Sequence, residues 1–226
     1  MIRDLLNVLY PPVCCGCRNL LLTGEKSICT KCRHELALTN YHLYSQTEAA
    51  SKFSGRLELA FVSCFVYFSK SSIAQKLIHE LKYKGQQQIG ELFAYWYATD
   101  LKQVPALQKI DYVVPVPLHK RRLRERGYNQ VARFAETLAQ TLGATYNDQL
   151  LIRNRYRKTL TTKNKSERLG QDSGIFGLNA EADKKSGHYL LVDDVLTTGS
   201  TLTQCGQALR EIPGVQISIV TMAMSI

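Results

Sequence analysis

Hydrophobic positions along the chain follow two different periods. Short apolar runs, rich in β-branched and aromatic residues, predict buried strands, and stretches with apolar residues three and four apart predict helices between them. The predicted strands are 57–68, 111–117, 149–155, 187–194 and 215–226, and the predicted helices are 72–85, 91–101, 129–143 and 202–212. Strands that alternate with helices predict an α/β fold, a doubly wound parallel sheet with ligands at the carboxyl ends of its strands.

This strong patterning is absent from the first part of the chain. Residues 37–56 are mostly polar and show no sustained period, which is typical of a connection between units. The sequence therefore predicts a small module over 1–40, a linker over 41–56 and an α/β domain over 57–226.

The N-terminal module is rich in cysteine. Two pairs with two intervening residues, Cys14 with Cys17 and Cys29 with Cys32, are separated by eleven residues. Four thiolates at this spacing are typical of a structural zinc site in a zinc-ribbon-like module, and so short a segment needs such a staple to fold. Two disulfides are the alternative, which an oxidising compartment would favour. Cys15 could replace either neighbour as a ligand.

The strand predicted over 187–194 ends in two adjacent acids, Asp193 and Asp194. A loop of small residues follows and opens a helix, so that backbone amides and hydroxyls face one point, as in phosphate sites. The acids suit ribose hydroxyls, while a capped helix start after a turn is the alternative interpretation. The expected phosphate-binding residues are Thr197, Thr198, Gly199, Ser200 and Thr201.

Basic residues are concentrated in two runs of the chain. The chain has 29 Lys and Arg against 19 Asp and Glu, a net charge of +10, and two runs, 119–126 and 153–168, hold this excess. Such runs are commonly solvated faces, but two of them beside one structural unit indicate an anionic ligand or partner.

Beyond these patterns, the segment LLVDDVLTTGST resembles the phosphoribosyl-pyrophosphate motif of type I phosphoribosyltransferases. The order of a cysteine-rich module, HELKYKG, VPVPLHKRRLRERGYNQ and this motif resembles the ComF/GntX family, whose ComF members are competence proteins. The resemblance covers nearly the whole chain. It implies a type I phosphoribosyltransferase-like domain that binds phosphoribosyl pyrophosphate with magnesium.

The resemblance also implies roles for particular residues. Asp193 and Asp194 would bind ribose, and the loop after the preceding strand would bring Lys120, Arg121 and Arg122 to the diphosphate. Residues 153–175 would form a catalytic hood. Lys82 and Lys84 of HELKYKG are further candidates, although lysines at the C-terminal end of a helix commonly do no more than interact favourably with the helix dipole. No catalytic residue is assigned.

The expected function is that of a competence protein in DNA uptake and natural transformation, with single-stranded DNA and the uptake machinery as partners. An active phosphoribosyltransferase on an unidentified acceptor is the alternative, and an interaction scaffold without activity is a third. No stretch reaches the roughly 18 uncharged apolar residues of a membrane helix, and the start does not resemble a signal peptide. We therefore expect a cytoplasmic protein that is not membrane-spanning, with a peripheral position at the inner face of the membrane as an alternative.

Overall fold

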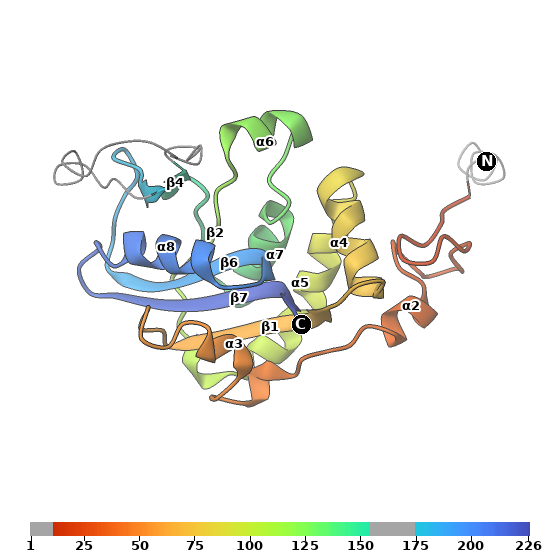
Figure 1. The fold of residues 1–226 in the computed structure, drawn as a ribbon, viewed down its shortest axis with the longest axis horizontal. Coiled ribbons are helices and arrows are strands. Elements are labelled where there is room, and N and C mark those ends of the chain that lie inside the picture. The colour runs from red at the N-terminus through yellow and green to blue at the C-terminus, as the bar shows by residue number, and fades with distance from the viewer. Residues whose placement is uncertain (1–10, 154–174) are drawn as a thin grey trace, which may run out of the picture.

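The computed structural model describes residues 11–153 and 175–226, and its centre is a parallel sheet (Figure 1). Within the described residues five strands pair in the order β1-β7-β6-β2-β3, and every pair is parallel. The sheet confirms the predicted α/β fold. Its strands are β1 (Phe61–Phe68), β2 (Tyr112–Pro115), β3 (Thr145–Tyr146), β6 (Gly187–Leu196) and β7 (Val215–Ser225).

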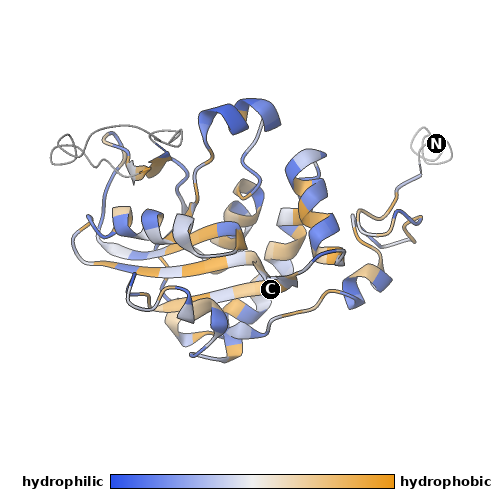
Figure 2. Ribbon diagram, in the orientation of Figure 1, coloured by the Kyte–Doolittle hydropathy of each residue, from blue (hydrophilic) through white to orange (hydrophobic). Residues whose placement is uncertain are grey.

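Helices cover both faces of this sheet, because each central strand is apolar on both sides. On β6, Leu190 and Val192 pack into a cluster with α4, α5 and α7, whereas Tyr189 and Leu191 pack into a second cluster with α8. Figure 2 shows the apolar strands between these layers. The helices of the domain are α4 (Ile73–Tyr83), α5 (Gln88–Leu101), η2 (Pro105–Leu107), α6 (Lys120–Arg126), α7 (Ala132–Leu142) and α8 (Ser200–Leu209).

Two predicted features differ in the structure. The basic run after β2, expected to be a loop, forms the helix α6, because its Lys, Arg, Leu and Glu residues are all good helix formers. The strand predicted over 149–155 does not join the central sheet. Instead β4 (Leu151–Arg153) pairs antiparallel with β5 (Phe176–Leu178) in a separate ribbon.

The N-terminal part of the chain lies against the domain. It contains α2 (Thr30–His34), and residues 37–39 then run antiparallel along the outer edge of β1, with Leu38 opposite Val66. This segment covers an edge that would otherwise expose unpaired backbone groups. No helix among the described residues is long and apolar enough to cross a membrane.

The expected linker over 41–56 contains η1 (Tyr41–Leu43) and α3 (Glu48–Ser51). Ala49 and Phe53 are almost completely buried in the cluster that also holds α8. The connection between the two units is thus packed against the sheet, and the boundaries 1–40, 41–56 and 57–226 stay a prediction.

Candidate functional site

Asp193 and Asp194 lie near the carboxyl end of β6, where the strand is still paired. Asp193 is opposite Thr221 of β7, and the pairing continues to Leu196. Because successive side chains of a strand point to opposite faces, Asp194 faces α4 and the turn that precedes α7, while Asp193 faces the start of α8. The two carboxylates therefore have different neighbours.

Asp194 is buried, and one of its carboxylate oxygens has two partners. Its Oδ2 accepts a hydrogen bond from Nε2 of Gln130 at 2.7 Å and lies 3.0 Å from Nζ of Lys82. A buried carboxylate needs such partners, since an unpaired charge away from water is costly. The structure thus brings Lys82, the first of the two candidate lysines, to the predicted acids.

Asp193 is only partly covered, yet its environment disfavours the charged form. Burial, followed by the charge of Asp194, raises the pKa of Asp193 to about 8, although the backbone amide of Asp194 and the charges of Lys82 and Arg153 act in the opposite direction. Two adjacent acids at the end of a buried strand keep this arrangement only at a cost in stability. Titratable groups with strongly shifted pKa values are concentrated at functional sites.

The loop 197–201 lies directly beyond Asp193. Gly199, in the left-handed region at φ +75°, is the N-cap of α8, and with Asp193 the residues 195–202 line a small hollow. The hydroxyl-bearing residues of the loop are exposed. Backbone amides at a helix start together with exposed hydroxyls form an arrangement that can hold an anion.

Two residues of the expected linker support this loop. Nη2 of Arg56 donates a hydrogen bond to the carbonyl oxygen of Thr198 at 3.2 Å. The ring of Phe53 packs so closely under Gly199 that a Cβ there would lie 3.1 Å from Cε1. Sequence reasoning missed both residues, because their stretch is polar and carries no periodic pattern that indicates burial.

Helix α6 holds the three residues expected at the diphosphate. Lys120, Arg121 and Arg122 are exposed on its first turn, and Nε of Arg121 pairs with Oε1 of Glu125 at 2.8 Å. Arg122 and Lys82 line one hollow, which also includes Tyr83, Gly85, Glu125, Arg126 and Tyr128. Figure 1 shows α6 raised above the carboxyl ends of the strands.

A chain of polar contacts joins α6 to Asp194 of β6. Nη1 of Arg126 donates a hydrogen bond to Oε1 of Gln130 at 2.7 Å, and Gln130 in turn donates to Asp194. The guanidinium of Arg126 also lies over the ring of Tyr83, 5.0 Å from its centroid. The buried Gln130 is a functional candidate that sequence reasoning missed, although it ends the quoted motif VPVPLHKRRLRERGYNQ.

The other candidates lie further away or outside the described residues. Lys84 is exposed at the end of α4 and lines neither hollow. Most of the expected hood, 153–175, falls in 154–174, outside the described residues. Arg153 is described, and its guanidinium lies 5.1 Å from the ring centroid of Phe176.

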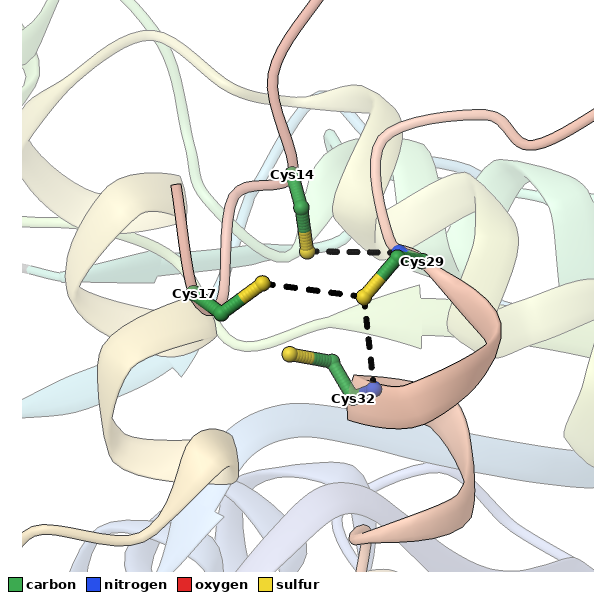
Figure 3. Close-up of side chains that lie close together, drawn as sticks. All are labelled: Cys14, Cys17, Cys29 and Cys32. Atoms are coloured by element: carbon green, nitrogen blue, oxygen red, sulfur yellow. Dashed lines mark hydrogen bonds between the residues drawn. The ribbon is translucent and has the colours of Figure 1, made fainter. Parts of the chain in front are cut away.

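Four cysteines come together at the N-terminal end of the described chain (Figure 3). The sulfur atoms of Cys14, Cys17, Cys29 and Cys32 all lie within 4.8 Å of one another, as the two paired spacings predict. All seven cysteines are free in the structure, which does not contain the alternative disulfides. Cys15 lies outside this cluster, and its thiol points to Oε1 of Gln86 at 3.8 Å.

The chemistry of the cluster fits a divalent zinc ion. Burial acts to raise the pKa of Cys14, but backbone amides of Cys29, Cys17 and Gly16 lower it to about 7. Burial and the neighbouring thiols, Cys17 first, raise the pKa of Cys32 instead. Four sulfur atoms this close cannot all ionise without a cation between them, and tetrahedral zinc takes four thiolates.

Comparison with known proteins agrees with this geometry. A family model described as the phosphoribosyl transferase domain matches residues 132–224. The DNA utilization protein YhgH of Salmonella typhimurium is 32% identical over 136 residues, 59% of this chain and 59% of that protein. Competence protein ComFC of Streptococcus pneumoniae is 30% identical over 150 residues, covering 66% and 63% of the two chains. Competence protein F of Haemophilus influenzae is 25% identical over 218 residues, covering 91% and 94%.

The parallel sheet and the matched domain define the class of the protein, an α/β protein with a phosphoribosyltransferase-like domain. The competence and DNA-utilization relatives extend the similarity to most of the chain. Their similarity supports a ComF-type, phosphoribosyltransferase-like protein, in agreement with the resemblance seen in the sequence. The aligned region spans only 59% of the YhgH relative.

Proposed function

We propose that the chain binds phosphoribosyl pyrophosphate with magnesium and acts as a competence protein in the uptake of transforming DNA. The ligand assignment rests on the carboxyl end of β6, where two acids lie next to a hydroxyl-rich loop and the start of a helix. Relatives named for competence and DNA utilization support the cellular role.

In this proposal each part of the ligand has its own neighbours. Asp193 and Asp194 bind the ribose hydroxyls, and the amides and hydroxyls of 197–201 bind the 5′-phosphate. Lys120, Arg121 and Arg122 bind the diphosphate, with Lys82 between the acids and α6. Magnesium supplies charge neutralisation of the diphosphate.

The four-cysteine cluster holds a structural zinc ion in this proposal. Its sulfur geometry supports that role, because thiolate ligands with amides directed at them are typical of zinc knuckles. Single-stranded DNA is proposed as a partner on account of the basic residues Lys120, Arg121, Arg122 and Arg124, which are exposed on α6. We propose the cytoplasm, or the inner face of the membrane, as the location.

An active phosphoribosyltransferase on an unidentified acceptor is the second candidate. The raised pKa of Asp193 favours it, because a carboxyl group that titrates near neutral pH can accept or donate a proton during transfer. Release of diphosphate in the presence of candidate acceptors separates this activity from binding alone.

Calorimetric titration with phosphoribosyl pyrophosphate, with and without magnesium, tests the proposal. We expect magnesium-dependent binding that weakens about 10-fold or more in Asp194→Asn. The matched control is Asp183→Asn, since Asp183 is exposed and pairs only with Lys185 among the described contacts. Absence of magnesium-dependent binding to the wild-type chain would overturn the ligand assignment.

The cellular role has a separate test. The chain is expressed in a naturally competent bacterium that lacks its own ComF-type gene, and transformation frequency is measured. We expect the wild-type chain to restore transformation and Asp194→Asn to restore much less. Equal frequencies with and without the wild-type chain would contradict the competence role.

A further inference from the structure

The last turn of α4 lies between the cysteine cluster and the acids of β6. In Figure 1 the N-terminal segment lies beside α4, and α4 ends close to α6. The residues that end this helix contact the cysteine cluster's segment on one side and the candidate ligand site on the other. This placement connects two features that the sequence presents as separate.

The first contact on the cysteine side is an ion pair. Nη2 of Arg18, the residue after Cys17, lies 2.6 Å from Oε1 of Glu80 on α4. The Glu80 side chain is only 9% exposed, so its carboxylate depends on this partner. Arg18 has a left-handed backbone at φ +67°, a conformation in which the turn of the first cysteine pair presents its side chain to α4.

Packing reinforces this ion pair. Gly16 lies so close to Cys32 and to Ile73 of α4 that a Cβ there would be 2.8 Å from Sγ of Cys32 and 3.4 Å from Cγ2 of Ile73. The buried cysteines belong to the same apolar cluster as Leu77 and Leu81 of α4. The cysteine cluster is therefore packed directly on α4, and a change in its geometry acts on this helix.

On its other side, the same turn of α4 contacts the candidate site. Lys82, two residues after Glu80, pairs with Asp194 at 3.0 Å. The carbonyl oxygen of Leu81 accepts a hydrogen bond from the hydroxyl of Tyr128, which itself accepts one from the amide of Gly85 at 3.2 Å. The position of Lys82 is thus determined by how the last turn of α4 is held.

We propose that Arg18 and Glu80 are positioning residues, through which the metal-loaded cysteine cluster holds Lys82 opposite Asp194 and supports binding of phosphoribosyl pyrophosphate. The inference rests on the proposed function for its ligand. It assigns the cysteine cluster a role at the ligand site, in addition to holding its own segment together. Loss of the ion pair releases the end of α4 while the four cysteine ligands stay unchanged.

Two variants remove the ion pair from opposite ends, Arg18→Met and Glu80→Gln. The matched control is Lys31→Met, since Lys31 lies on the same segment but pairs with exposed Glu35 at 3.9 Å. Arg18→Lys keeps the charge and is the conservative rescue, although an ammonium replaces the guanidinium fork. Zinc content per chain is measured first for every variant, so that loss of metal is separated from loss of the contact.

Two measurements then test the positioning role of Arg18 and Glu80. We expect Arg18→Met and Glu80→Gln to bind phosphoribosyl pyrophosphate about 5-fold more weakly at unchanged zinc content, with Arg18→Lys in between and Lys31→Met unchanged. Hydrogen exchange of the Lys84 amide, which donates to the carbonyl of Glu80, should be faster in the same two variants. A purely structural contact would lower the melting temperature without changing affinity.

The outcomes separate the inference from the proposed function. If the wild-type chain binds no phosphoribosyl pyrophosphate, the proposed function fails, and unchanged exchange at Lys84 would then overturn the positioning role as well. If the wild-type chain binds the ligand and both variants match it in affinity, the inference is wrong while the proposed function stands. Weaker binding in both variants at full zinc content supports both.

Discussion

Nζ of Lys82 lies 3.0 Å from Oδ2 of Asp194, and this contact joins the last turn of α4 to the carboxyl end of β6. The Lys82 side chain is 22% exposed and that of Asp194 is 9% exposed, so the pair is mostly removed from water. Its partners come from HELKYKG and LLVDDVLTTGST, two segments that carry the family resemblance. The contact gives HELKYKG a place in the candidate site.

Removing the lysine should therefore leave a buried, under-compensated carboxylate. We expect Lys82→Met to lower the free energy of unfolding by about 2 kcal/mol, measured by urea denaturation at pH 7. Lys84→Met is the control, since Lys84 is exposed and should change stability by less than about 0.5 kcal/mol. The double variant Lys82→Met with Asp194→Asn should recover most of the loss, and no recovery would show that the pair is not coupled.

Asp193 should reduce stability at neutral and alkaline pH. Its folded-state pKa of about 8 is above the ordinary carboxyl value of about 3.9, so the folded protein binds the proton more tightly than the unfolded chain. The penalty is absent below about pH 4, grows as the pH rises and is complete above the folded pKa. We expect Asp193→Asn to be more stable than wild type by about 1 to 2 kcal/mol at pH 8.5.

The same comparison at pH 4 checks the sign. There the two proteins should unfold at nearly the same urea concentration, because the carboxyl is protonated in the folded state and about half protonated in the unfolded chain, so that little of the penalty remains. A variant that is less stable than wild type at pH 8.5 would contradict the raised pKa. Asp183→Asn, at an exposed site, should show no such dependence on pH.

Gly199 should be costly to replace for two separate reasons. An alanine there is strained by the left-handed backbone at φ +75° and meets the ring of Phe53. Gly143, at φ +72° with open space around it, isolates the backbone contribution. We expect Gly143→Ala to cost about 1 kcal/mol and Gly199→Ala about 2 kcal/mol or more in thermal denaturation. Equal costs at the two positions would show that the Phe53 contact is unimportant.

The cysteine cluster makes a prediction about metal content. We expect one zinc ion per chain by elemental analysis, its loss in Cys32→Ser, and its full retention in Cys15→Ser, because the Cys15 thiol lies outside the cluster. Chelation should destabilise the protein by several kcal/mol, since thiolates this close repel one another without a cation. Loss of zinc in Cys15→Ser would restore the alternative that Cys15 is a ligand.

Much of the fold is readable from local patterns. The alternation of Leu190 and Leu191 between the two faces of β6 follows from strand geometry, and the helix that ends at Gly143 does end there, in a left-handed cap. The predictions are weaker for segments whose burial depends on contacts with residues far away in the sequence. Phe53 lies in a polar stretch and is buried because it packs under Gly199 and into the cluster that includes α8.

The sequence by itself determined the α/β alternation, the cysteine pairs and the adjacency of Asp193 to the hydroxyl-rich loop, because each is a property of neighbouring residues. Only the tertiary structure decided that Lys82 and Gln130 meet Asp194, that Arg56 supports the loop, and that Arg18 reaches Glu80. Those contacts depend on how helices pack on the sheet and on which charges become buried together. A linear pattern records which face of an element is apolar, but not which distant side chain comes to lie against it.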